Sequence, residues 1–330
     1  MTRRAKVLKP DTILKNYWKD NGRFADLFNA VLFDGKPFIK PEELDDADTD
    51  ESSILEHREF VQSIQASRDI IKTRKKSLAH GVEFVLLGKE SQEHIHYAIP
   101  LRVMGYDYST YKKQYDANAR KYKASDGMTA DEYLSRMKRT DKFYPVITVV
   151  VYYGEAPWDG AVTLHEMLHI PKEMAAFVND YKIPLIEARQ NSLRLHHADN
   201  VDLFQLLHII LDGSSQKQNA KEQAIEYCEK HQTDRSVIMA VAGATNTSIN
   251  YQAFQKGEVT MCTLFDEIAK EHETKGRMEG RMEGRAEEII ESSYEMNLSE
   301  HDILMRLQKK LDISLQKAQE YFSRYAKHTI

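Results

Sequence analysis

Asp69, Glu90 and Gln92 are the residues whose types and spacing are best suited to chemistry. The two acids are 21 positions apart (90 − 69 = 21), which is enough for two adjacent strands and their connection. Carboxylate oxygens are ligands that Mg²⁺ prefers, and Mg²⁺ can stabilise phosphoryl charge and activate a water. The pattern is therefore compatible with metal-assisted phosphodiester hydrolysis. Three polar residues at the ends of surface strands would show the same spacing.

Two predicted strands and a helix would position these residues. The first strand begins the stretch at residues 68–72, and the second is the apolar run at residues 82–88. Because strand side chains alternate, Glu90 and Gln92 share one face if the second strand continues that far. A long helix is predicted over residues 93–111.

The rest of the chain predicts a mixed α/β protein. Residues 144–153 are β-branched and apolar on both faces, which is typical of a fully buried central strand. The apolar spacing at residues 10–35 predicts a helix interrupted at Asn21-Gly22. Other predicted elements are a strand at residues 183–186 and helices at residues 201–227, 237–244 and 261–268.

One stretch resembles a known family. Residues 87–107 read LGKESQEHIHYAIPLRVMGYD, in which Glu-x-Gln precedes Pro-Leu-Arg. This run resembles the Rpn family of recombination-promoting nucleases, also labelled putative transposases, within the PD-(D/E)xK nuclease superfamily. The segments at residues 24–33 and 145–160 and the Gly-Arg-Met-Glu repeat support the resemblance, which covers roughly residues 20–290.

The resemblance implies an α/β restriction-endonuclease-like core of element order αβββαβ with a helical C-terminal region. It also implies Mg²⁺-dependent cleavage of double-stranded DNA. By position, Asp69 matches the first metal-binding acid and Glu90 the second. Gln92 stands where most of the superfamily places Lys, and Gln cannot supply a cation to the developing negative charge.

Other residues would have to compensate for that missing cation. Lys72, Lys89 and Arg102 are the candidates, and Arg102 is the best placed because its helix follows the second strand. Asp26, on the first helix, is a candidate additional acid, although a solvent-facing Asp is the simpler interpretation.

Charge is distributed unevenly along the chain. The net charge is −5, but residues 111–145 carry nine Lys/Arg and five acids, a balance of 9 − 5 = +4. Such a stripe suits phosphate contact, and a solvated loop of mixed charge explains it equally well. The candidate DNA-binding residues are Lys112, Lys113, Arg120, Lys121 and Lys123.

A competing motif and an inactive alternative stay open. His165, Glu166 and His169 fit H-E-x-x-H, the pattern of a zinc metallopeptidase. Pro171 ends the predicted short helix two residues after the second His, so we prefer the nuclease. The other alternative is a catalytically inactive DNA- or protein-binding relic of a nuclease.

We expect four regions along the chain. These are a PD-(D/E)xK nuclease-like core over residues 10–190, a helical region over 191–274, a Gly-Arg-Met-Glu repeat linker over 275–290 and a C-terminal helical pair over 291–330. The repeat has an oligomerising helix as its alternative interpretation. A double-strand cut would need two protomers, which is compatible with a homodimer.

Composition predicts a cytoplasmic protein. Hydrophobic residues make up 42% and charged residues 29%, an ordinary globular balance. The longest apolar run is too short to cross a bilayer, and no apolar segment follows the basic N-terminus. Cys228 and Cys262 match no metal pattern and are expected to be reduced thiols. The expected partner is double-stranded DNA, with no membrane.

Overall fold

The computed structural model describes residues 7–46, 52–57, 60–65, 70–74, 83–88, 95–122, 127–212, 217–247, 249–250, 260–296 and 298–326. The chain divides into two compact units, Met1–Leu264 and Phe265–Ile330. Among the described residues, no helix combines the length and apolar character that a bilayer span requires.

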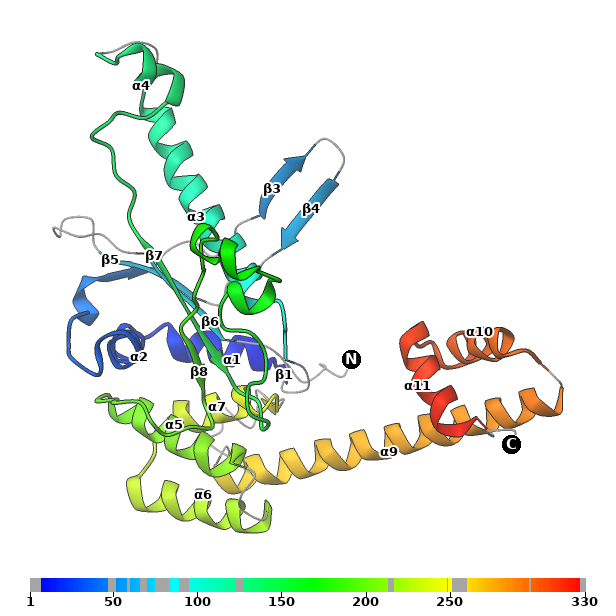
Figure 1. Ribbon diagram of the computed structural model, residues 1–330. Helices are drawn as coiled ribbons and strands as arrows, with labels where there is room; N and C mark the ends of the chain where they lie inside the picture. Colours follow the sequence, from blue (N-terminus) through cyan, green and yellow to red (C-terminus); the bar gives the residue numbers. More distant parts are fainter. Residues whose placement is uncertain are drawn as a thin grey trace, which may run out of the picture. The chain divides into compact units, whose positions relative to one another are not determined.

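A five-stranded mixed sheet forms the centre of the first unit, in the order β2-β5-β6-β7-β8 (Figure 1). The β2–β5 and β5–β6 pairs are antiparallel, whereas β6–β7 and β7–β8 are parallel. A parallel pair needs a crossover, and α3 (Ile99–Lys121) supplies it between β6 and β7. The strands are β2 (Leu44–Asp46), β5 (Ile70–Arg74), β6 (Glu83–Gly88), β7 (Val146–Tyr152) and β8 (Leu185–Glu187).

Strand β7, an interior strand next to the central β6, is buried on both faces. Val149 and Val151 are fully buried, and Val146 and Val150 pack on the opposite side against α3 residues such as Val103. A near-continuous apolar run suits a strand that is covered on both sides. The buried strand predicted over residues 144–153 is therefore confirmed.

Helices α1 (Pro10–Trp18) and α2 (Asn21–Phe33) cover the face opposite α3 (Figure 1). The rings of Phe24 and Phe28 stack at 4.5 Å between centroids, and Phe28 meets Phe84 of β6 edge-on at 5.1 Å. This aromatic contact joins the helices to the sheet.

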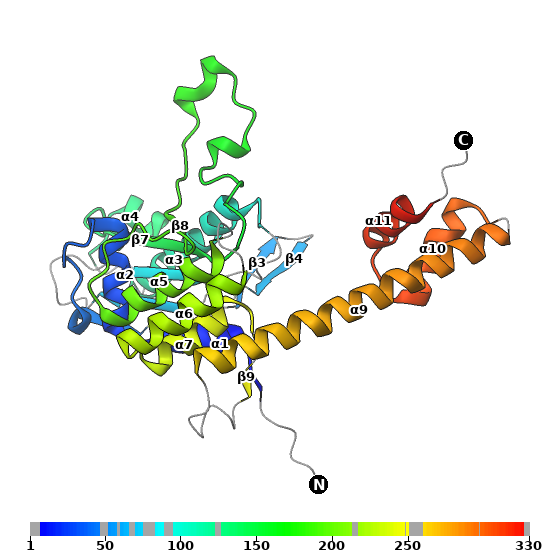
Figure 2. The same cartoon turned by 90° about the horizontal axis from the view of Figure 1, so that it is seen from below.

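Three further helices follow in this unit (Figure 2): α5 (Ala198–Leu211), α6 (Lys217–His231) and α7 (Arg235–Ala244). Helix α7 packs on α1, α5 packs on α7, and α6 packs on α5. At Gly243 of α7, an added Cβ would lie 3.0 Å from both Leu14 Cγ and the Pro10 carbonyl oxygen. Glycine therefore permits the close approach of α7 to α1. The helical pattern predicted over residues 201–227 corresponds to two helices, α5 and α6.

The helix predicted over residues 93–111 has different bounds. It begins at Ile99, because Pro100 is suited to a first helical turn, and it continues to Lys121. At its far end lies the short helix α4 (Ala130–Ser135).

Short elements complete the first unit. They are the two-residue pair β1 (Val7–Leu8) and β9 (Ile249–Asn250), the hairpin β3 (Ser52–His57) and β4 (Phe60–Gln65), and the 3₁₀ helices η1 (Pro41–Glu43), η2 (His165–Met167) and η3 (Lys172–Phe177).

The second unit is helical. Helix α9 (Met261–Glu295), which starts in the first unit, includes the predicted repeat linker, and α10 (Glu300–Leu311) and α11 (Leu315–Tyr325) follow. Ser299 and Ser314 cap α10 and α11 by accepting from the backbone N–H of Asp302 and Lys317. The predicted C-terminal helical pair is therefore confirmed. Its core consists of Ala286, Ile289, Ile290, Ile303, Leu304, Leu307, Leu311, Ala318 and Tyr321.

Candidate functional site at one end of the central sheet

The start of β5 and the end of β6, the strands next to the predicted site in the sequence, lie at the same end of the sheet. Ile70, the first residue of β5, pairs with Leu86, and Gly88, the last of β6, pairs with Val151. The parallel strands β6, β7 and β8 all end there, and α3 starts after β6. In open α/β sheets, ligands commonly bind outside the carboxyl ends of parallel strands.

The principal site residues adjoin the described strands β5 and β6 in the sequence. Asp69 immediately precedes β5 in the sequence, and Glu90 and Gln92 follow β6 by two and four positions. All three lie outside the described residues, as do Lys89 and Lys123. Their roles therefore stay predictions.

Lys72 is fully buried and bonded within the protein. Its ammonium donates to the Lys19 carbonyl oxygen at 2.6 Å, to Asn21 Oδ1 and to Asp46 Oδ1 at 2.9 Å. A lysine ammonium has three protons, so these three acceptors use them all. Lys72 thus ties the α1–α2 turn and β2 to β5, and its position does not suit contact with a phosphate.

Arg102 lies in the first turns of α3, at the sheet end where β6 finishes. Its Nε and Nη2 donate to the Tyr106 hydroxyl at 3.2 and 2.9 Å. The Arg102 side chain is half-buried.

Asp26 connects α2 to the start of α5. Its Oδ1 accepts from the His196 backbone N–H at 2.8 Å, and its Oδ2 accepts from Asn200 Nδ2 at 2.9 Å. Asn200 is buried, and its Oδ1 also accepts from the Tyr17 hydroxyl. Both carboxylate oxygens of Asp26 therefore help to join α2 to α5. The simpler expectation, an Asp that only faces solvent, does not describe this residue.

The candidate DNA-binding residues of the described chain lie on α3, in two kinds of environment. Lys112 pairs with Asp116 at 2.6 Å, one helical turn further on. Lys113 is half-buried, whereas Arg120 and Lys121 are exposed in the last turn of the helix. The exposed cations therefore gather at the far end of α3.

The His165–His169 segment does not form the two-turn helix that a zincin requires. Only residues His165–Met167 are helical, as a 3₁₀ turn, and Leu168 is extended. The Glu166 carboxylate accepts from the N–H groups of Val162 and Thr163, and His165 Nε2 lies 2.8 Å from the Val178 carbonyl oxygen. Across the residues that the structure describes, no group of three or more His, Cys, Asp or Glu could hold a metal.

Glu187 is the last residue of β8 and lies at the same end of the sheet as the predicted site. The sequence analysis did not predict it as a site residue. Its Oε2 accepts from Trp158 N–H at 3.1 Å and from Arg189 Nε at 2.9 Å, and Gln190 donates to its Oε1. Burial, together with the nearby Glu187 charge, raises the pKa of Tyr152. The position of Glu187 directly after a predicted strand was the available sequence signal.

A buried polar cluster on the α3 face was also not anticipated. Asp107 of α3 accepts from the Thr148 hydroxyl of β7 at 2.6 Å and from the Tyr181 hydroxyl. Burial, followed by this hydrogen bond, raises the pKa of Tyr181. The signal was a lone Thr in the apolar run of β7, which needs a polar partner when buried.

Comparison of the chain with protein-family models, with curated proteins and with solved structures found no match.

Proposed function

We propose that the chain is a Mg²⁺-dependent DNA endonuclease with a PD-(D/E)xK type of core. The observation that supports this best is the order α2, β2, β5, β6, α3, β7, with the first three strands antiparallel and β7 parallel to β6. Apart from the β3–β4 hairpin inserted between β2 and β5, it agrees with the αβββαβ order that the family resemblance implies.

The strand register supports the choice of residues. Because Ile70 pairs with Leu86, the chain enters β5 and leaves β6 at the same end of the sheet. In this proposal, Asp69 precedes that entry and Glu90 follows that exit, so both carboxylates belong to segments attached to one sheet end. Carboxylate oxygens are suitable ligands for Mg²⁺.

The proposed residues have separate roles. Asp69 and Glu90 hold the metal, which when bound supplies charge stabilisation at the phosphate and a more acidic water. The Gln92 amide orients the attacking water. Between the described candidates for the missing cation, Arg102 is preferred, because the Lys72 ammonium is enclosed by three oxygens.

The test is cleavage of supercoiled plasmid by the full chain with Mg²⁺. Asp69→Asn and Glu90→Gln keep side-chain size but remove a metal-ligating charge, so each should abolish cutting, as should a chelator. The matched control is Asp45→Asn, because Asp45 is an exposed acid on β2. It should cut as the wild type does.

Two results would contradict the proposal. Equal cutting by the wild type and both site variants would place the activity elsewhere or in a contaminant. Binding of duplex DNA that weakens with salt, without cutting by any variant or by the wild type, would favour the inactive relic.

A further inference from the structure

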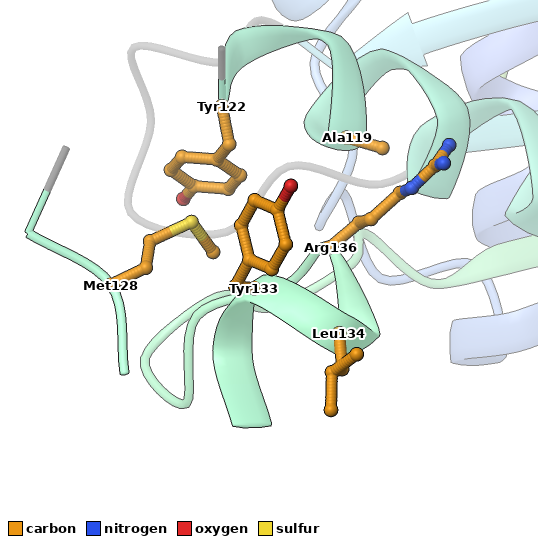
Figure 3. Close-up of a pocket in the computed structure, with 6 residues that line it drawn as sticks. All are labelled: Ala119, Tyr122, Met128, Tyr133, Leu134 and Arg136. Atoms are coloured by element: carbon orange, nitrogen blue, oxygen red, sulfur yellow. The ribbon is translucent and has the colours of Figure 1, made fainter. Parts of the chain in front are cut away.

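A pocket of about 380 Å³ lies between the end of α3 and α4. Its volume falls within the usual range of small-molecule sites, about 300–1,000 Å³. In Figure 3 the rings of Tyr122 and Tyr133 lie side by side with Met128 next to them, and the Arg136 side chain extends towards Ala119. Leu134 completes the lining.

Local hydrogen bonds hold the Tyr122 wall in place. The Asp141 carboxylate accepts from Asn118 Nδ2 at 2.7 Å, from the Tyr122 hydroxyl at 2.8 Å and from the Lys138 N–H at 2.7 Å. The hydrogen bond to Asp141 raises the pKa of Tyr122, so its ring stays neutral. The Lys138 ammonium lies 5.2 Å from the centroid of that ring, within cation–π distance.

The second wall is set by the capping box of α4. The Thr129 hydroxyl accepts from the Glu132 N–H, and the Glu132 carboxylate accepts from the N–H groups of Thr129 and Arg139. Tyr133 follows directly on this helix. Arg136 ends the helix in the left-handed conformation at φ 52°. The capping box and the helix end therefore fix the backbone that carries Tyr133 and Arg136.

The surroundings of the pocket are positive. In the described part of residues 118–145 there are six Lys/Arg and three acids, a balance of 6 − 3 = +3. Two of those acids, Glu132 and Asp141, accept hydrogen bonds from their own loop. Arg120, Lys121, Arg136 and Arg139 are exposed.

Aromatic faces beside cations suit one chemistry in particular. Bases of single strands stack on aromatic side chains while basic groups follow the phosphates. Tyr133 is 56% exposed and Leu134 79%, so apolar surface is open to a ligand. A neutral apolar ligand would gain nothing from the surrounding cations, whereas a nucleotide strand uses both features.

We propose that this pocket binds an unstacked nucleobase of a DNA strand, with Tyr133 and Tyr122 contacting the base and Arg136 the adjacent phosphate. The choice of DNA as the polymer rests on the proposed function. The site is distinct from the proposed metal site, since α3 separates the sheet end from the pocket by its length.

The experiment measures strand binding by the full chain in EDTA, so that cleavage does not interfere. The probes are a fluorescent oligodeoxythymidylate and an abasic strand of equal length and charge. We expect the base-bearing strand to bind about 5- to 150-fold more tightly. Tyr133→Ala should bring this ratio close to one, and Tyr133→Phe should restore it.

Tyr108→Ala is the matched control, because Tyr108 is 54% exposed on α3 outside the pocket lining. It should keep the wild-type ratio. Thermal melting monitored by circular dichroism should give the same melting temperature for Tyr133→Ala as for the wild type, which would show that the variant remains folded.

Two results would overturn the pocket assignment. They are equal binding of base-bearing and abasic strands by the wild type, and an unchanged ratio in Tyr133→Ala. Base-dependent binding without plasmid cleavage would keep the pocket and reject the nuclease. Cleavage without base preference would reject the pocket alone.

Discussion

Lys72 in the sheet and Lys121 at the end of α3 show how differently the first unit uses one residue type. The Lys72 ammonium is fully buried and donates to three oxygens from the α1–α2 turn and β2. Lys121 is exposed in the last turn of its helix. The first stabilises the fold, whereas the second is available to an anionic partner.

Tyrosines repeat the contrast between these two regions. Tyr181 donates its hydroxyl to the buried Asp107, while Tyr133 is more than half exposed beside a pocket. Buried polar groups are costly unless paired, so the body around the sheet commits its polar groups to internal partners. The arm made by the end of α3 and by α4 bonds its polar groups locally and leaves its aromatic faces and cations to solvent.

The largest expected effect comes from breaking the Lys72 contacts. Lys72→Met keeps the side-chain length but leaves acceptors without their charged donor, which should lower the free energy of unfolding by about 2–4 kcal/mol. Urea denaturation measures this difference. Lys112→Met is the control, because its exposed pair with Asp116 should contribute less than about 0.5 kcal/mol. Equal losses in both variants would remove the distinction between buried and exposed lysines.

A smaller effect on stability is expected from Tyr181 at high pH. The folded pKa of Tyr181 is raised, so above about pH 10 the unfolded chain releases this proton before the folded chain does. The unfolded state then binds fewer protons, and the free energy of unfolding falls as pH rises. Tyr181→Phe should make this fall less steep. A slope equal to that of the wild type would count against the Tyr181–Asp107 pairing.

The smallest effect on global stability is expected in the arm. Thr129→Ala removes the capping box of α4, a local cost of about 0.5–2 kcal/mol. Because α4 has no buried residues, global unfolding in urea should change by less than about 0.5 kcal/mol, while amide exchange within residues 130–135 becomes faster. A large global loss would mean that the arm and the sheet unfold together.

The elements that could be predicted are those whose signals are local. The apolar run of β7 and the helical patterns of α10 and α11 depend on residues close together in the sequence, and these elements formed as predicted. The Asp69, Glu90 and Gln92 site rests on spacing and resemblance, and it stays a prediction because those residues lie outside the described chain.

Only the tertiary structure decided how distant segments meet. Lys72 looked like a free cation until the α1–α2 turn enclosed it, and Asp107 met partners 41 and 74 positions away. The His165 backbone N–H donates to Asp180 Oδ1, which lies 15 positions further along the chain. The segment forms a short 3₁₀ turn instead of the longer helix that the metal motif needs. Sequence by itself determined the periodicities and caps, because these depend on neighbouring residues. Burial and pairing depend on contacts across the fold, which no local pattern specifies.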